Sequence, residues 1–387
     1  MIEKILFSLI AFLLFAYIFI FKLIRKNDTT YLFILISQAV GILINFIQIL
    51  FNISAVGIWK IIVYILCLII PAIVLVLEKL GINFTELVYV AISKIVLAFE
   101  NRKKAKELLI NLVAKYDKSY MGHKMLAEIY EKEGGMRKAI DEYVKVLDIK
   151  GDDYKSYFKI SQLLNDLGKK NEAIQMLTTL LKKKPELYEA SKMLGELLLD
   201  KEKFKEAAHI YVQSIKYNTD KADLYYNLGI AYSRLNEFSL AKECYKKAVD
   251  IDSNLYNAYY RLGQISLLYR DIDSAEHYFM QSIYGEVELK SYYQLAKIYM
   301  MKNDKNRAVI FLNKATEVSE FFYELSNKEP IFFAIKKLII KPENGEENRP
   351  NESEKEKTIS EYLDNTYNLT KILNEKESKK SNNEFKI

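Results

Sequence analysis

The sequence has few of the residues that build catalytic or metal sites. It contains three histidines and two cysteines among 387 residues. His123, His209 and His277 are far apart, and none has a second ligand at metal-binding spacing. Cys67 and Cys244 are too few for a disulfide framework. The sequence also lacks a glycine-rich phosphate loop, a nucleophile elbow and a paired Cys-x-x-Cys motif. We therefore expect no enzymatic activity, no metal and no cofactor.

Charge of one sign is not concentrated anywhere in the chain. The formal net charge is +6, and the basic residues are spread along the sequence. A nucleic-acid-binding surface would need a clustered basic patch, so no nucleic-acid partner is expected. Frequent isoleucine, lysine, asparagine and tyrosine are typical of an AT-rich bacterial genome.

Long apolar runs fill the first eighty residues. The run from Ile5 to Phe21 is uncharged, and its flanking residues Lys4 and Lys22 can extend a short membrane span by snorkelling. A cleaved signal peptide is the rival interpretation. It would need small residues at a cleavage site, whereas residues 15–19 are bulky. The pattern therefore favours a retained membrane span.

Two further apolar runs follow. Residues 31–51 are uncharged, and residues 61–77 form the third run, with Trp59 and Tyr64 as candidate interface anchors and Pro71 as a candidate kink. We expect a membrane domain over residues 1–80 with about three transmembrane helices; two long tilted spans are the alternative.

Loop charges predict the orientation. The first loop carries Lys22, Arg25 and Lys26 against one aspartate, and the second loop carries no charge. Basic residues are again frequent after residue 78. Because basic loops stay in the cytoplasm, we expect a multi-pass protein of the cell membrane. Its N-terminus would lie outside and everything after the third span would be cytoplasmic.

The second span carries small and polar residues on one helical face: Gln38, Gly41, Asn45 and Gln48. Such a face favours close helix packing and interhelical hydrogen bonds in lipid. It could pack against the other spans of the same chain, form a homo-oligomer, or contact another membrane protein.

A period of 34 residues dominates the chain from Tyr120 onward. With Tyr120 as position 1, position 20 is alanine in five successive units and again after 33 residues in a sixth. Positions 7 and 24 are apolar or aromatic, and position 8 is small. The position-8 residues are Ala127, Ser161, Gly195, Gly229, Gly263 and Ala296. Each unit is predicted to be two amphipathic helices, which must stack on neighbouring units to bury their apolar faces.

The unit that starts at Ala222 resembles the tetratricopeptide repeat. Its matching residues are Tyr225, Leu228, Gly229, Tyr232, Ala241, Tyr245 and Ala248. It departs from the family pattern at Ser253, where proline is usual. We therefore expect an all-α fold in which N-terminal transmembrane helices precede a tetratricopeptide-type α-solenoid, a superhelix of helix pairs. The repeats would span residues 120–322.

Three other segments surround these repeats. Residues 81–119 are a linker or a degenerate first repeat, because Ala105 and Leu109 keep the phase while residues 86–99 lack the glycine position. They could instead lie on the membrane. Residues 323–341 are expected to form a C-terminal capping helix. The charged tail, residues 342–387, is expected to be disordered.

The resemblance implies a groove lined by positions 2, 5, 9 and 12 of each first helix. Position 5 holds Lys124, Phe158, Lys192, Tyr226, Tyr260 and Tyr293. The four aromatic rings among them would form a floor suited to peptides. The frequency of tyrosine in this chain is the competing explanation.

Some tetratricopeptide domains grip a C-terminal carboxylate with lysine, asparagine and arginine on successive repeats. Lys192, Asn227 and Arg261 match those positions. Glu196 stands where asparagine is expected and Asn257 where lysine is expected, so a carboxylate clamp is disfavoured.

Two functions follow from these patterns. The first is a membrane-anchored scaffold whose groove recruits cytoplasmic protein partners. The second is a structural or regulatory subunit of a membrane complex, in envelope synthesis or protease regulation, that contacts its partners through the transmembrane helices. The regulatory role is suggested by similarity to bacterial anchored repeat proteins. Those commonly have one span and a C-terminal metal knuckle, and this chain has neither feature.

Overall fold

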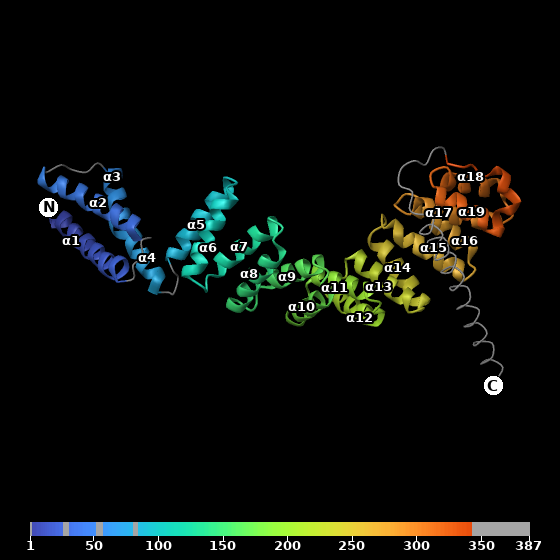
Figure 1. Cartoon of the computed structure of the whole chain (residues 1–387), viewed down its shortest axis with the longest axis horizontal. Coiled ribbons are helices and arrows are strands. Elements are labelled where there is room, and N and C mark those ends of the chain that lie inside the picture. Colours follow the sequence, from blue (N-terminus) through green and yellow to red (C-terminus); the bar gives the residue numbers. More distant parts are fainter. Residues whose placement is uncertain (1, 26–30, 52–56, 80–83, 343–387) are drawn as a thin grey trace, which may run out of the picture. The chain divides into compact units, whose positions relative to one another are not determined.

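The computed structural model describes residues 2–25, 31–51, 57–79 and 84–342. Within these ranges the chain is helical and contains no strand, so the all-α prediction is confirmed. Figure 1 gives the order of the helices. The chain divides into two units, one up to Ala173 and one from Ile174, which are described separately. The tail predicted to be disordered lies outside the described residues.

The apolar N-terminal runs form three helical segments. The first is α1 (Ile2–Tyr17) with the π-helical η1 (Ile18–Ile24), and the second is α2 (Leu32–Leu50). The third is α3 (Gly57–Tyr64), the π-helical η3 (Ile65–Ile69) and α4 (Ile70–Lys79). Among the described helices one, Ile5–Ile24, is long and apolar enough to cross a membrane, whereas the apolar stretches Ile34–Leu50 and Ile61–Leu77 are shorter.

The third segment departs from α-helical geometry just before Pro71. Proline has no backbone N–H, so the Cys67 carbonyl, four residues earlier, lacks its usual helical donor. The Gln38 side-chain amide from α2 donates to that carbonyl at 3.1 Å. Ile70 N–H bonds to the Ile65 carbonyl in the π-helical pattern. A polar residue in an apolar helix thus satisfies a backbone group that proline would otherwise leave unpaired.

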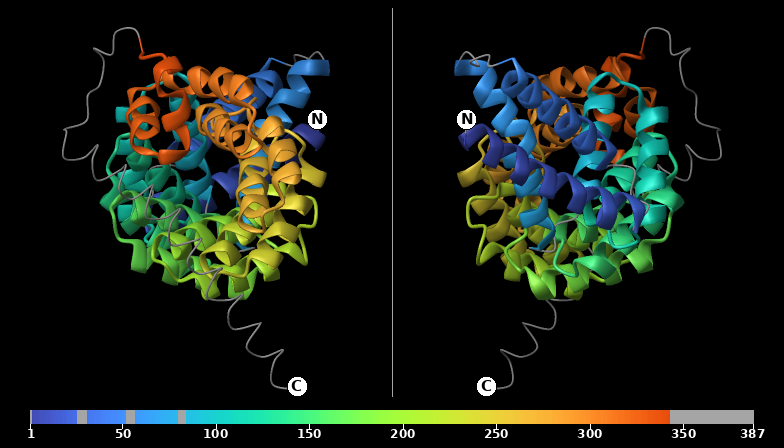
Figure 2. Two further views of the ribbon diagram at one scale, coloured as in Figure 1. Left: turned by 90° about the vertical axis from the view of Figure 1, so that its right-hand side faces the viewer. Right: turned by 90° about the vertical axis from the view of Figure 1, so that its left-hand side faces the viewer.

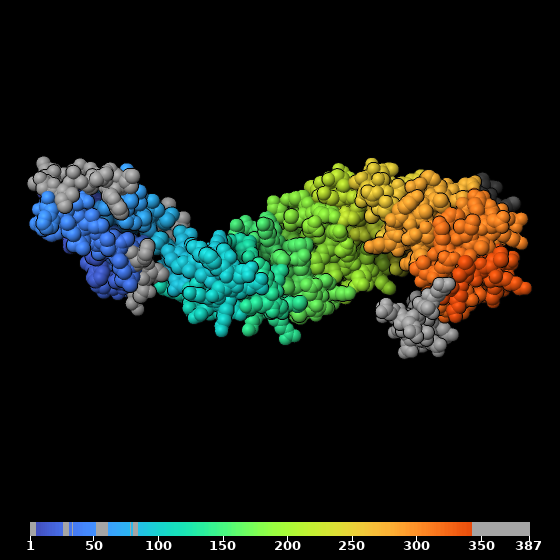
Figure 3. All heavy atoms as spheres, turned by 90° about the horizontal axis from the view of Figure 1, so that it is seen from above, coloured from blue at the N-terminus to red at the C-terminus, as the bar shows by residue number. Residues whose placement is uncertain are grey.

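Helix pairs follow one another from residue 84. In the first unit the helices are α5 (Phe84–Ala98), α6 (Arg102–Lys115), α7 (Tyr120–Lys132), α8 (Met136–Ile149) and α9 (Tyr154–Asp166), and α10 (Lys170–Lys183) crosses the boundary. The second unit contains α11 (Tyr188–Asp200), α12 (Phe204–Ile215), α13 (Ala222–Arg234), α14 (Phe238–Ile251), α15 (Tyr256–Leu268), α16 (Ile272–Ser282), α17 (Glu288–Met301), α18 (Lys305–Thr316), α19 (Glu320–Lys328) and the 3₁₀ helix η4 (Pro330–Leu338). Figures 2 and 3 show α13–α18, in yellow to orange, stacked closely beside one another.

Residues 84–115 form a helix pair in phase with the repeats. Ser93 occupies position 8 of this pair and is fully buried, so serine takes the place of the missing glycine. Ala105 and Leu109, at positions 20 and 24, are also fully buried. The α5–α6 pair therefore has the internal packing of the later units.

The turn between the two helices of a unit uses one backbone conformation throughout. Position 15 has a positive φ in seven successive pairs, at Glu100, Gly134, Gly168, Glu202, Asn236, Arg270 and Asn303. Only two of these residues are glycine, the residue that adopts this conformation without strain. Asn236 and Asn303 also adopt this conformation more readily than most residues, so the flanking helices must impose it chiefly at Glu100, Glu202 and Arg270.

Position 8 is small because an aromatic ring from the second helix occupies the space beside it. A Cβ atom added to Gly195 would lie 2.2 Å from Tyr211 Cζ, and one added to Gly229 would lie 2.6 Å from Tyr245 Cε1. These distances are far below van der Waals contact. Glycine at position 8 and the aromatic ring at position 24 therefore pack against each other within one repeat, and this pair recurs with the 34-residue period.

Candidate protein-binding face

The first-helix face is defined as positions 2, 5, 9 and 12 of each unit's first helix, together with position 6. In the part of the chain from Ile174 onward, the helices α11, α13, α15 and α17 carry this face. Position 5 of these helices is occupied by Lys192, Tyr226, Tyr260 and Tyr293. The structure gives these four side chains very different surroundings.

Lys192 belongs to a bonded cluster of three residues. Its Nζ atom lies 2.8 Å from Asp223 Oδ2, and the Tyr188 hydroxyl donates a hydrogen bond to the same carboxylate. The side chains of Lys192 and Asp223 are about one-third exposed. Burial raises the pKa of Asp223, but the hydrogen bonds from Lys192 and Tyr188 outweigh it and hold the pKa below its usual value. Burial and the hydrogen bond to Asp223 raise the pKa of Tyr188 to about 12.

A similar cluster occurs in the part of the chain before Ala173. Lys124 Nζ lies 2.9 Å from Asp153 Oδ2 and donates to the Tyr120 hydroxyl, also at 2.9 Å. Sequence reasoning missed both clusters. Tyrosine at position 1 with lysine at position 5, present in these two units, was the available signal. The cluster joins the first helix of one unit to the start of the next.

Two of the aromatic residues at position 5 are buried to different degrees. Tyr260 is 5% exposed, and its ring packs edge-on against Phe279 at 5.5 Å between centroids. Tyr226 is half-buried and lies 5.7 Å from the Tyr245 ring. These tyrosines pack back onto the position-24 ring of their own unit. Phe158, in the first unit, is half-buried.

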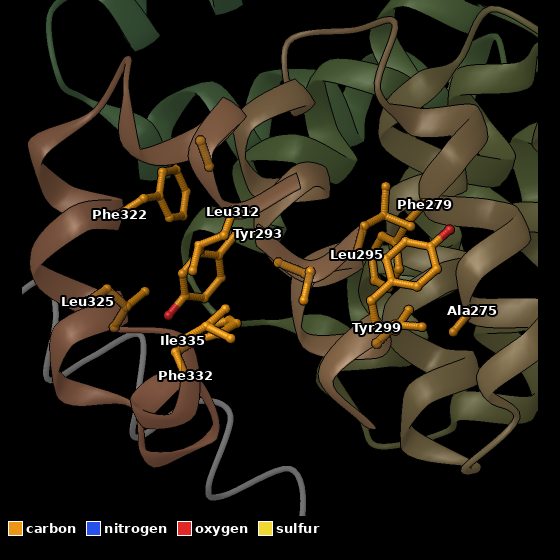
Figure 4. Close-up of a cluster of buried hydrophobic side chains, with 14 of the residues drawn as sticks. Ala275, Phe279, Tyr293, Leu295, Tyr299, Leu312, Phe322, Leu325, Phe332 and Ile335 are labelled. Carbon is orange, nitrogen blue, oxygen red and sulfur yellow. The ribbon is translucent and has the colours of Figure 1, made fainter. Parts of the chain in front are cut away.

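Tyr293 is covered by the C-terminal segment. It is fully buried, and its ring lies 5.1 Å from Phe322 and 5.4 Å from Phe332 between centroids (Figure 4). The predicted continuous aromatic floor is therefore wrong at Tyr260 and Tyr293. At Tyr260 the ring completes a core, and at Tyr293 the segment after the last repeat fills the position. Phe158 and Tyr226 remain candidate contact residues.

The polar members of the face remain accessible. Arg261 is exposed, with Nη1 3.1 Å from Gln264 Oε1, and Asn227 is half-buried. Glu196 is also exposed. Burial raises the pKa of Glu196, and the negative charge of Asp223 raises it further. The positive charge of Lys192 lowers this pKa but does not outweigh burial, so the net shift is upward. One face thus carries both charge signs.

Family models match this region directly. The tetratricopeptide repeat models match residues 158–225, 222–255 and 289–321. Residues 158–255 and 289–321 therefore consist of tetratricopeptide repeats. Tetratricopeptide repeats form protein-interaction scaffolds, and we assign this chain to that class. A comparison with curated proteins gave no match.

Several solved tetratricopeptide repeat structures are similar to this chain. The C-terminal part of a repeat protein from Cytophaga hutchinsonii has 18% identity, covers 58% of this chain and 93% of its own, and has a TM-score of 0.50. MamA from Desulfovibrio magneticus has 22% identity, covers 43% and 94%, and has a TM-score of 0.39. YrrB, described as having an unusual peptide-binding site, has 20% identity, covers 50% and 97%, and has a TM-score of 0.42.

The tetratricopeptide carboxylate clamp does not fit this geometry well. The lysine of the clamp, Lys192, is already neutralised by Asp223 and bonded to it. Glu196, one helical turn away on the same helix, would repel a carboxylate. Only Arg261 remains as an exposed cation of the matched set.

The small and polar face of α2 makes contacts within the chain. Asn45 Nδ2 donates to Ser8 Oγ in α1 at 2.7 Å, and Gln38 bonds to the third segment as described above. A Cβ atom at Gly41 would meet Cys67 Sγ at 2.1 Å, so this glycine permits close approach of the two helices. Gln48 is half-buried.

Among the described residues, no group of three or more His, Cys, Asp or Glu side chains could hold a metal ion.

Proposed function

We propose that this protein is a membrane-anchored scaffold that recruits a cytoplasmic protein partner through the first-helix face of its second unit. The observation that carries the proposal is the accessible set Glu196, Tyr226, Asn227 and Arg261 on three successive first helices. These residues combine an aromatic ring, an amide and both charge signs, a composition suited to a polar peptide. Tyr226 packs against Tyr245 yet stays partly exposed, and Glu196 and Arg261 are exposed at the surface.

The partner is proposed to be an internal segment of a protein rather than a C-terminus. A free carboxylate would approach Glu196 and Asp223 and find Lys192 already paired. A partner residue with a negative side chain could instead pair with Arg261, while a basic or amide residue faces Glu196. Electrostatic complementarity of this mixed kind fixes the register of a bound chain.

Anchoring is proposed to rest on the N-terminal helices. Their outward side chains are large and apolar, and Leu13, Phe46, Leu50 and Ile61 are each more than half exposed. Such a surface is unfavourable in water and favourable in lipid. We propose three spans with the N-terminus outside, the repeats in the cytoplasm and the loop lysines at the inner surface. Anchoring raises the local concentration of the repeats, so weak binding to the partner suffices.

The binding face can be tested by crosslinking and pull-down from native membranes. Arg261→Glu should remove the partner by reversing the exposed cation. Lys246→Glu, an exposed charge reversal on the second helix α14, is the matched control and should retain the partner. Recovery of the same proteins with both variants would refute binding through this face.

The orientation can be tested by thiol labelling of intact cells. In a background that lacks Cys67 and Cys244, Lys246→Cys should be protected from a membrane-impermeant reagent and should react after lysis. Labelling in intact cells would place the repeats outside and overturn the proposed topology.

The alternative, contact with other membrane proteins through α2, has less support because Gln38 and Asn45 bond within the chain. Gln48→Leu would distinguish the two functions, because Gln48 is only half-buried. Loss of co-purifying membrane proteins with this variant, while Arg261→Glu retains them, would favour the alternative.

A further inference from the structure

The segment after the last repeat, residues 329–341, is held firmly along its inner side. Phe332 and Ile335 are buried at successive turns of η4, against the core that contains Tyr293 (Figure 4). Glu329 forms an ion pair with Lys297 of α17 at 3.1 Å, and both side chains are about nine-tenths buried. These contacts fix which residues of the segment face inward.

Asn313 of α18 holds the end of the same segment by its backbone. Its Nδ2 atom donates to the Leu338 carbonyl at 3.2 Å, and Ile340 N–H donates to Asn313 Oδ1 at 3.0 Å. An asparagine that bonds both an N–H and a carbonyl fixes an extended backbone much as a neighbouring strand would. The outward side chains are therefore presented in a defined arrangement.

Those outward side chains are apolar and basic. Phe333, Leu338 and Ile340 are 55%, 58% and 46% exposed, respectively. Lys336 and Lys337 are exposed between them. Lys341 follows and is exposed as well. From 330 to 342 the sequence contains no acidic residue, and within the described residues none of the three lysines forms an ion pair.

We propose that this outward surface of residues 333–341, the C-terminal patch, docks on an anionic lipid bilayer. Aromatic and aliphatic side chains interleaved with lysine are the composition of segments that lie in a membrane interface. Protein–protein interfaces differ, because lysine is depleted there and arginine enriched. Each lysine near an anionic surface strengthens association roughly five-fold. The charge of the patch therefore selects an anionic lipid surface over a protein partner.

Tryptophan fluorescence in proteoliposomes of the full chain tests this docking. The chain has one tryptophan, Trp59, so Phe333→Trp in a Trp59→Phe background gives a single reporter. Vesicles contain brominated phosphatidylcholine with or without phosphatidylglycerol. Docking predicts a blue shift and quenching by the brominated lipid only when phosphatidylglycerol is present. Lys336→Gln, added to this background, should lower the ratio of docked to undocked protein about five-fold.

The matched control is Tyr269→Trp in the same background, because Tyr269 is 48% exposed at the end of α15. That reporter should not respond to the lipids. Three results would overturn the proposal: quenching that is equal with and without phosphatidylglycerol, quenching by aqueous acrylamide in every vesicle, or shielding from both quenchers. The last result would mean that the patch is covered by residues 343–387 or by a second copy of the chain.

The proposal does not depend on the N-terminal anchor, and the same vesicles separate the two. Native Trp59 in the unmodified chain should be quenched by brominated lipid whether or not phosphatidylglycerol is present, if the N-terminal helices insert. An unquenched Trp59 would contradict the anchor and leave the C-terminal patch to be judged by its own reporter.

Discussion

Replacing the three buried tyrosines at position 24 by phenylalanine is predicted to lower stability in two repeats and to raise it in the third. The Tyr143 hydroxyl lies 3.0 Å from Glu131, and the Tyr245 hydroxyl lies 3.2 Å from Ser233. Both partners are at position 12 of the same unit. Two units lie between them. In the second of these, position 12 is Leu199, and the buried Tyr211 hydroxyl forms no hydrogen bond of acceptable geometry with the described residues, although Asn227 lies nearby.

The magnitudes follow from the state of each hydroxyl. A typical hydrogen bond contributes about 0.5–1.5 kcal/mol to stability, whereas a buried unsatisfied polar group costs about 1–3 kcal/mol. Tyr143→Phe and Tyr245→Phe should therefore destabilise their units by about 1 kcal/mol. Tyr211→Phe keeps the ring against Gly195 and removes the unpaired hydroxyl, so it should stabilise by about 1 kcal/mol.

The assay is native-state hydrogen exchange on the full chain in lipid nanodiscs. Units of a repeat protein open locally, so amides of the helix pair that carries each substitution report its effect. Protection should rise about five-fold in α11 and α12 for Tyr211→Phe, and should fall by a similar factor for the other two variants. Equal loss of protection in all three would refute the reasoning, because it would mean that ring packing alone sets the outcome.

Two further predictions concern the same helices. Gly229→Ala should destabilise α13 and α14, because the added Cβ atom would lie 2.6 Å from Tyr245. Overpacking costs about 1–3 kcal/mol, which outweighs the gain of about 1 kcal/mol in helix propensity. The control Gly151→Ala, whose Cβ would lie 3.6 Å from its nearest atom, should be near neutral. The lowered pKa of Asp223 means that its bond to Lys192 contributes stability above about pH 4 that is lost as the pH falls through the folded-state pKa. Asp223→Asn should therefore be less stable than the wild type at neutral pH, and it should lose less stability on acidification. Hydrogen exchange measured over a series of pH values tests this, and the same pH dependence in the variant as in the wild type would contradict it.

The repeat architecture was readable from the sequence because its physical causes recur with a fixed period. Small residues at position 8 and rings at position 24 recur together, since each requires the other for the helices to approach. The pair Gly229 and Tyr245 carries this signal within a single unit. The apolar N-terminal runs were equally visible, because uncharged stretches of that length have no place on a soluble surface.

Other features depended on contacts between segments distant in the sequence. Nothing local to Pro71 indicates that Gln38 will supply the missing donor to the Cys67 carbonyl. The φ of about 59° at Arg270 is likewise hidden, because helix packing imposes it on a residue that does not favour it.

The sequence by itself determined the helical units, their number of residues and the small and large positions of their cores, because these follow from periodic burial. The tertiary structure decided which face residues remain open to a partner. Tyr226 and Tyr293 occupy the same position of their units, yet only Tyr226 is partly open, because residues 320–338 fold back over the last repeat. Exposure depends on what covers a residue, and that neighbour is set by the end of the array rather than by the repeat.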